Sequence, residues 1–267
     1  MSDVPKPYVS RDPAKIRAKD LGKSFGGFVA LHNVDIEIGN GEFLSLLGPS
    51  GCGKSTLLRI IAGLELASSG TIEVDGEPLR GTPPGLGMVF QQDGLLDWRN
   101  VLNNVLLPVE FAGEQKRAFK EKAREILALY GLKDFEQRHP WELSGGMRQR
   151  VAICRALILD PAFLMMDEPF GALDALTRDE LNIELQMLWM RTKKSILFVT
   201  HGIAEAVFLS DRIAVMATSP GRIVEILNID LPRPRDFSVR ATKRFGAYVD
   251  HIRELFEKHG LFRSRPR

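Results

Sequence analysis

The chain has 267 residues, of which 44% are hydrophobic and 26% are charged, so it can bury a full core and does not have the composition of a disordered protein. Its 36 Lys and Arg residues against 34 Asp and Glu residues leave a net charge of +2. That balance does not suit a surface that coats a polyanion, and we therefore expect no nucleic acid partner.

Neither a membrane span nor a secretion signal is predicted. No apolar run approaches the roughly 18 to 20 residues that a bilayer-spanning helix needs, and residues 1–12 lack the apolar block of a signal peptide. We expect the chain itself to stay in the cytoplasm. Cys52 and Cys154 are in no CxxC or Cys/His array, so we expect reduced thiols rather than a metal site or a redox pair.

The first clear pattern along the chain is a strand, a loop and a helix. Residues 34–38 alternate between apolar and polar, a Gly-Asn-Gly turn follows, and residues 43–47 are apolar, which predicts two strands joined by a turn. The second strand leads into a glycine-rich loop, and the apolar residues at 57–64 then have helical spacing.

The glycine-rich loop fits the phosphate-binding pattern GxxxxGK[ST] in the strand and helix context that this pattern requires. It consists of Gly48, Pro49, Ser50, Gly51, Cys52, Gly53, Lys54 and Ser55. Glycines allow many backbone N–H groups to approach a phosphate, and the helix N-terminus adds its dipole. We predict that Lys54 bridges the β- and γ-phosphates of ATP, that Ser55 binds Mg²⁺ and that Thr56 reaches a further phosphate oxygen.

The later elements predict an α/β fold. A hairpin is expected at 71–76, and four short apolar strands that suit a buried parallel sheet are expected at 88–90, 163–166, 196–200 and 213–216. Strand signals vanish between residues 91 and 160, where helical periodicity replaces them. We therefore expect a P-loop NTPase core with a mainly parallel sheet, an antiparallel β subdomain and an inserted helical subdomain.

The expected domain organisation has three parts. They are an N-terminal extension at 1–14, a nucleotide-binding domain at 15–230 with its helical subdomain at about 92–160, and a C-terminal extension at 231–267. The last part begins with a Pro/Arg-rich link, and its residues 245–256 have the spacing of an amphipathic helix. This helix either regulates the protein or merely packs against it.

Two carboxylates follow the apolar strand at 163–166. Asp167 and Glu168 are thereby placed at the carboxyl edge of a parallel sheet, where ligands bind in such folds. Alone, such a pair is more often a helix cap or a turn. With a phosphate loop upstream, we predict that Asp167 holds Mg²⁺ through water and that Glu168 polarises the attacking water as general base.

The segment Leu-Ser-Gly-Gly-Met-Arg-Gln at 143–149 resembles the LSGGQ signature of ABC-type ATPases. From the residues alone, Ser144 with Gly145 and Gly146 at the start of a helix makes a second anion-binding site. The resemblance implies that two copies meet head to tail, with each ATP between one copy's phosphate loop and the other copy's signature. Ser144, Gly145 and Gly146 would then reach the γ-phosphate that the partner binds.

The resemblance, which covers about residues 15–225, implies roles for four further residues. Gln91 resembles the glutamine that contacts Mg²⁺ and the attacking water and senses the permease, and His201 resembles the switch histidine that bonds the γ-phosphate. Phe25 matches the aromatic residue that stacks on adenine, and Asp174 would cross the dimer contact and couple the two sites.

Residues 93–101 resemble the surface that receives the permease's coupling helix, although core packing is an alternative for Trp98. Three stretches are similar to the nitrate, sulfonate and taurine importer ATPases: 95–101, 167–178 and 219–223 with the link at 231–235. The chain departs from the family at Met147 in place of the signature Gln, at Asp97 in place of Pro, and at Gly202 in place of the Asp that usually follows the switch histidine.

The predicted function is that of the ATP-binding and ATP-hydrolysing subunit of an ABC importer, located at the cytoplasmic face of the membrane. Its expected partners are transmembrane permease subunits, a second copy of the chain and, indirectly, a periplasmic or extracellular solute-binding protein. The expected solute is nitrate, a sulfonate or taurine, and a thiamine-pyrimidine precursor is an alternative. A soluble ABC ATPase without a transport role would normally show paired domains or coiled-coil insertions, and a silent scaffold subunit would not need Lys54, Asp167, Glu168 and His201.

Overall fold

The computed structural model describes residues 14–261. The predicted N-terminal extension therefore lies almost wholly outside the described residues, as do residues 262–267 of the predicted C-terminal extension. The chain forms two compact units: the described parts of Met1–Pro84 and Gln186–Arg267 make the first, and Gly85–Leu185 makes the second. None of the described helices is long and apolar enough to cross a membrane.

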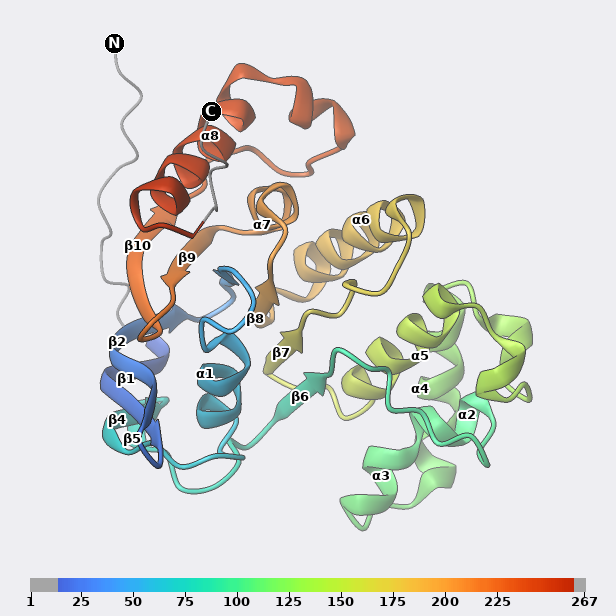
Figure 1. The fold of residues 1–267 in the computed structure, drawn as a ribbon. Coiled ribbons are helices and arrows are strands. Elements are labelled where there is room, and N and C mark those ends of the chain that lie inside the picture. The colour runs from blue at the N-terminus through green and yellow to red at the C-terminus, as the bar shows by residue number, and fades with distance from the viewer. Residues whose placement is uncertain (1–13, 262–267) are drawn as a thin grey trace. The chain divides into compact units, whose positions relative to one another are not determined.

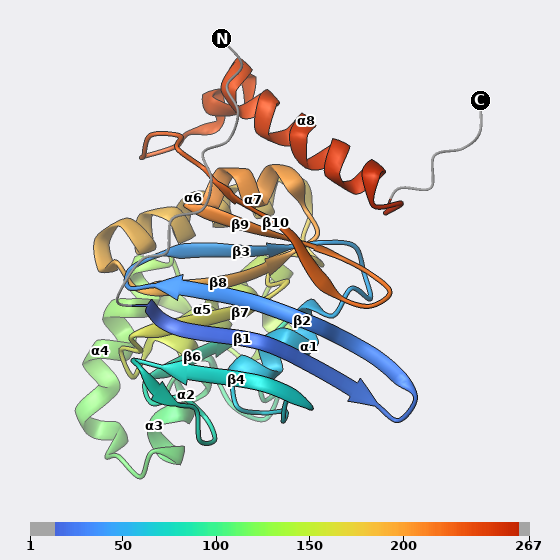
Figure 2. The ribbon, with the colours of Figure 1, turned by 90° about the vertical axis from the view of Figure 1, so that its left-hand side faces the viewer.

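The first unit contains an antiparallel sheet with the strand order β2, β1, β4, β5. Its strands are β1 (Ala14–Phe25), β2 (Phe28–Gly39), β4 (Ser69–Val74) and β5 (Glu77–Pro78). Figure 2 shows β2, β1 and β4 as one curved layer. The predicted alternation in β2 is present, because Val34, Ile36 and Ile38 are buried on one face of the strand.

A second group of strands in the first unit surrounds β3 (Phe43–Leu47). This strand pairs in parallel with β8 (Ser195–Thr200) on one side and with β9 (Arg212–Ala217) on the other, and β10 (Arg222–Asn228) pairs antiparallel with β9. Every residue of β3, β8 and β9 is buried, as expected for continuous apolar strands in a parallel sheet. Leu47 is in register with Thr200, so the loops that follow β3 and β8 begin at the same edge.

The helices of the first unit are α1 (Lys54–Ile61), α7 (Ile203–Leu209), the 3₁₀ turn η3 (Phe237–Ala241) and α8 (Lys243–Lys258). The predicted amphipathic stretch at 245–256 falls within α8, which is drawn in red in Figure 1. Thr242 caps this helix by accepting a hydrogen bond from the N–H of Phe245, and Phe245, Ile252 and Phe256 bury its apolar face.

In the second unit, β6 (Leu86–Val89) and β7 (Phe163–Asp167) pair in parallel, and helices fill the chain between them. These are α2 (Val101–Val105), α3 (Leu107–Phe111), α4 (Lys116–Leu129), η1 (Lys133–Phe135), η2 (Pro140–Glu142) and α5 (Gly145–Leu157). The long helix α6 (Ala175–Thr192) follows β7, and its residues from Gln186 onward belong to the first unit. The expected strand at 88–90 ends one residue earlier, and the short helices α2 and α3 are additions to the prediction.

Candidate nucleotide site

The phosphate loop begins immediately after the buried strand β3 and ends at the first residue of α1. Gly51 and Gly53 have φ values of 79° and 93°, which L side chains rarely adopt, so glycine is required for this turn. Gly53 is the N-cap of α1 and supplies no side-chain bond, and the first turn of α1 contains no acidic residue. The backbone N–H groups of this turn are therefore suited to an anionic ligand.

Lys54 is only 4% exposed, and its ammonium group lies within the loop. Nζ donates to the carbonyl oxygens of Gly48 and Pro49 at 2.9 and 3.0 Å. A Cβ at Gly48 would lie 2.7 Å from Cys52 Sγ and 2.8 Å from the carbonyl oxygen of Met216 in β9, so the start of the loop packs closely against Cys52 and β9. Cys52 and Cys154 are both buried, and no disulfide joins them in the described part of the chain.

His201 and Phe25 are the other predicted site residues of the first unit. His201 is exposed and directly follows β8, at the same edge of the sheet at which the phosphate loop leaves β3. Phe25 ends β1 and is 47% exposed, with Lys23 Nζ 4.7 Å from the centre of its ring. An exposed ring at the end of a strand is available for stacking, whereas a ring in the core is not.

In the second unit, Asp167 is the last residue of β7 and is 9% exposed. Glu168 follows it with φ at 44°, in the left-handed region, where a residue with a long side chain is strained. The N–H of Gly171 donates to the Glu168 carbonyl oxygen at 3.1 Å and helps to hold this turn. Strain of this kind concentrates at functional sites, and the sequence contained no signal for it.

Gln91 comes two residues after β6 and is exposed. Val89 of β6 is in register with Met166 of β7, so Gln91, two residues past β6, and Asp167, the last residue of β7, lie at the same edge of this strand pair. The structure thus brings the predicted glutamine and the predicted acidic pair to one edge.

The signature residues begin helix α5. Ser144 is the N-cap, with ψ at 163°, and its hydroxyl accepts a hydrogen bond from the N–H of Met147 at 3.3 Å. Gly145 and Gly146 form the first turn, and a Cβ at Gly146 would lie 2.5 Å from Thr177 Cγ2 of α6. Ser144 is nevertheless exposed, so capping leaves this end of the helix accessible.

Helix α5 also holds the loop that follows Gln91 through hydrogen bonds that no sequence pattern predicted. Arg155 donates to the carbonyl oxygens of Asp93 and Gly94, at 2.7 Å in the latter case, and Arg148 Nε donates to Asp93 Oδ2 at 3.1 Å. Burial lowers the pKa of Arg155. The helix that carries the signature therefore positions the segment after Gln91.

Trp98 and Asp174, two residues predicted to contact a partner, are both exposed to solvent. Trp98 is 75% exposed, so the alternative of core packing is wrong. Asp174 is also exposed, and its Oδ1 accepts a hydrogen bond from the N–H of Thr177 at 3.0 Å at the start of α6. This backbone hydrogen bond is the main reason that the pKa of Asp174 is lowered.

Within residues 14–261, no cluster of three or more His, Cys, Asp or Glu side chains could hold a metal ion by itself. A divalent ion held by the Ser55 hydroxyl, or one held by Asp167, would therefore need phosphate oxygens as further ligands. That combination fits Mg²⁺, which is usually held by one or two carboxylates together with substrate phosphates.

A phosphate loop after a central parallel strand, an acidic pair after another strand and a Ser-Gly-Gly helix start together define a nucleotide-binding ATPase. Residues 31–171 match the family model described as ABC transporter. The chain belongs to the ABC transporter family, as its sequence motifs predicted, and it is an ATPase of the ABC type.

The chain is similar to named members of this family over most of its length. It is 49% identical over 230 residues to an uncharacterized ABC transporter ATP-binding protein of Methanocaldococcus jannaschii, covering 85% of this chain and 86% of that protein. It is 44% identical over 253 residues to the taurine import ATP-binding protein TauB of Escherichia coli, covering 92% and 99% respectively.

A solved ABC transporter cassette, described as dimeric, superposes with a TM-score of 0.71 at 32% identity, covering 81% of this chain and all of that one. The same cassette in a post-hydrolysis state with ADP and Pi gives a TM-score of 0.68 at 31% identity, with the same coverage. The expected architecture, with a mainly parallel sheet, an antiparallel sheet and inserted helices, is confirmed.

Proposed function

We propose that this chain is the ATPase subunit of an importer for a small sulfonate of the taurine class, working as a pair of copies at the cytoplasmic face of a membrane permease. The 44% identity to TauB carries this proposal. That match covers 92% of the chain, and the unmatched remainder is shorter than the segment 231–267, so the similarity extends into the C-terminal extension. The exposed Trp98 in the loop after Gln91 supports a docking role for residues 93–101.

The proposed roles of the first unit's residues follow from their chemistry. Backbone N–H groups at residues 48–56 and the ammonium group of Lys54 hold the β- and γ-phosphates of ATP, and Phe25 stacks on the adenine ring. Ser55 binds Mg²⁺, which when bound neutralises phosphate charge. His201 donates to the γ-phosphate and orients the attacking water.

The proposed roles of the second unit's residues complete the reaction. Asp167 and Gln91 bind Mg²⁺, and Glu168 accepts a proton from the water that attacks the γ-phosphate. Ser144, Gly145 and Gly146 hold the γ-phosphate that a second copy binds, while Asp174 couples the two sites. Closure on binding ATP and opening after hydrolysis would drive the permease.

The test uses the complex of this chain with its permease and its solute-binding protein. Phosphate release is measured while the binding protein is loaded in turn with taurine, an alkanesulfonate, nitrate or a thiamine-pyrimidine precursor. We expect stimulation by taurine or an alkanesulfonate. Stimulation by nitrate or by the pyrimidine alone would assign a different solute, and hydrolysis indifferent to every loaded binding protein would contradict a role in import.

A further inference from the structure

His201 lies in a turn that leads into a helix of only seven residues, α7. A helix of this length is not stable alone, so its position depends on the packing of its buried residues 206–209 and on what holds its two ends. Its N-cap is Gly202, which has no side chain with which to cap it. At this end, the Thr200 hydroxyl donates to Glu205 at 2.5 Å and accepts from the N–H of Gly202 at 2.9 Å.

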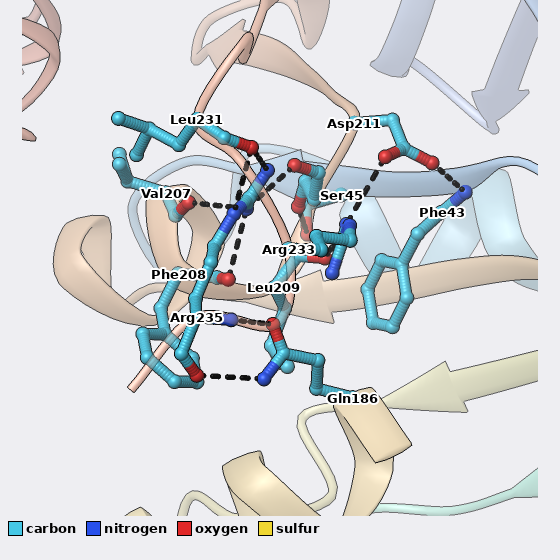
Figure 3. A network of polar contacts seen from close by, with 11 residues as sticks. Phe43, Ser45, Gln186, Val207, Phe208, Leu209, Asp211, Leu231, Arg233 and Arg235 are labelled. Carbon is cyan, nitrogen blue, oxygen red and sulfur yellow. Dashed lines mark hydrogen bonds and ion pairs between the residues drawn. The ribbon is translucent and has the colours of Figure 1, made fainter. Parts of the chain in front are cut away.

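The other end of α7 is held by a side chain from the C-terminal extension. Arg235 Nη1 donates to the carbonyl oxygens of Val207, Phe208 and Ser210, each at 2.9 Å (Figure 3). These belong to the last turn of α7 and the residue after it, where a helix leaves carbonyl groups without partners. A cation is also favoured at this end by the helix dipole.

Arg235 is itself fixed through its backbone. Its N–H donates to Gln186 Oε1 at 2.8 Å, and Gln186 Nε2 donates back to the Arg235 carbonyl oxygen at 2.7 Å (Figure 3). Gln186 is on α6 and is 1% exposed, while Arg235 is 3% exposed. The guanidinium also donates to the Leu231 carbonyl oxygen, which ties it to its own segment.

The same end of α7 is tied to the strand that leads into the phosphate loop. The hydroxyls of Ser210 and Ser45, the central residue of β3, are 2.5 Å apart. Arg233 donates to Asp211 Oδ1 at 3.1 Å, and Asp211 Oδ2 accepts from the N–H of Phe43 at 3.0 Å (Figure 3). The link at 231–235 therefore joins the end of α7 to β3.

Stability alone does not explain this arrangement. Among the described residues, the Arg235 guanidinium donates only to main-chain carbonyl oxygens, and burial with the nearby charge of Arg233 lowers its pKa to about 9. A buried charge is costly, and an apolar side chain can often fill such a space at a lower cost. What the guanidinium supplies is a rigid set of donors that lysine cannot reproduce.

We propose that Arg235 is a positioning residue for ATP hydrolysis. By fixing the C-terminal end of α7 to β3 and α6, it sets the place of His201, at the other end of the helix, relative to Lys54 and the phosphate loop. The C-terminal extension is then part of the ATPase machinery. This inference rests on the proposed roles of Lys54 and His201.

The test is a double-mutant cycle on the full-length chain with its permease. Arg235→Lys keeps the charge and removes the set of donors, and we expect kcat to fall about tenfold or more with little change in the KM for ATP, because misplacing a catalytic group by about 1 Å can cost on the order of 100-fold. In a chain that already carries His201→Ala, Arg235→Lys should lower kcat no further, because both substitutions remove the same contribution of His201 to hydrolysis. Arg244→Lys on the exposed surface of α8 is the matched control and should leave kcat unchanged.

An unchanged kcat in Arg235→Lys would overturn the proposal. So would an equal loss of kcat when Arg235→Lys is made in the wild-type chain and in the His201→Ala chain. If Arg235→Lys is not recovered as a folded chain, Gln186→Met replaces it in the double-mutant cycle, because it removes both hydrogen bonds to the backbone of Arg235. The same two results for kcat would then overturn the proposal. Wild-type hydrolysis that persists in Lys54→Ala would instead refute the proposed function, whatever Arg235 does.

Discussion

Glu168 combines a carboxylate half-buried next to the end of β7 with a left-handed backbone. We predict that Glu168→Gln binds ATP as the wild type does and hydrolyses it about 100-fold to 10,000-fold more slowly, because the loss of a general base has effects of this size. The amide has nearly the same shape, so folding should be unaffected. Phosphate release and ATP binding by the same preparation measure the two effects separately.

Glu254→Gln is the matched control for this prediction, since Glu254 is an exposed carboxylate on α8. It should hydrolyse ATP at the wild-type rate. Turnover by Glu168→Gln within a factor of about three of the control would exclude Glu168 as the general base.

At the same scale, packing alone already requires a glycine at position 146 of the signature. An added Cβ would lie 2.5 Å from Thr177 Cγ2, and overpacking of this kind costs about 1 to 3 kcal/mol. We predict that Gly146→Ala lowers the melting temperature by roughly 2 to 10 °C. Thr177→Ser removes the methyl group that clashes, so the double variant should recover most of the loss. Equal melting temperatures for Gly146→Ala and the double variant would show that the backbone, rather than this contact, accounts for the effect.

At the scale of elements, periodicity predicted the segments that are buried throughout or on one face. The strands β3, β8 and β9 and the helix α8 fall where apolar runs or helical spacing placed them. The first strand, β1, was not predicted, although the buried residues Ile16 and Ala18 alternate with Lys15, Arg17 and Lys19, because this alternation is short and the pairing shifts register at several points. Such irregularity is set by the partner strand and is invisible in one strand's own sequence.

The predicted site residues are those that a local motif contains. The hydrogen bonds from Arg155 and Arg235 to backbone carbonyl oxygens were not predicted, because the sequence around an arginine does not indicate which carbonyl group it will bind. Arg155 reaches Gly94 across 61 positions, and Arg235 reaches Ser210 across 25. Pairings of this kind exist only once the elements have packed, so sequence patterns can predict candidate reacting groups but not the side chains that hold them in place.

The α5 link can be tested directly. We predict that Arg155→Lys, which cannot keep both bonds to the Asp93 and Gly94 carbonyl oxygens, makes amide hydrogen exchange in residues 92–96 about tenfold faster, because hydrogen bonds of charged groups contribute about 1.5 to 3 kcal/mol. Arg150→Lys is the control, since Arg150 is on the same helix and pairs with Glu180 and Glu184 instead. Exchange that rises equally in both variants would point to a general loosening of α5.

At the scale of the whole molecule, the chain has two helix starts that we predict to bind an anion, one at Gly53 and one at Ser144. A single ATP needs only one phosphate loop, so the second start requires a separate explanation. A two-fold pair in which each copy offers its signature to the other copy's nucleotide uses both. The solved cassette to which this chain is similar is described as dimeric, which favours this arrangement.

The shared-site arrangement makes a prediction that no monomeric mechanism makes. Lys54→Ala and Ser144→Arg should each abolish hydrolysis when they are the sole copy, because every site then lacks either the lysine or the serine. An equal mixture forms mixed pairs in which one site carries both defects and the other carries neither, so phosphate release should return to about a quarter of the wild-type rate. Ser144 is exposed, and loss of its cap costs only about 1 kcal/mol, so the arginine variant should fold. A mixture that stays inactive after its subunits have been shown to exchange would mean that each copy builds its site alone.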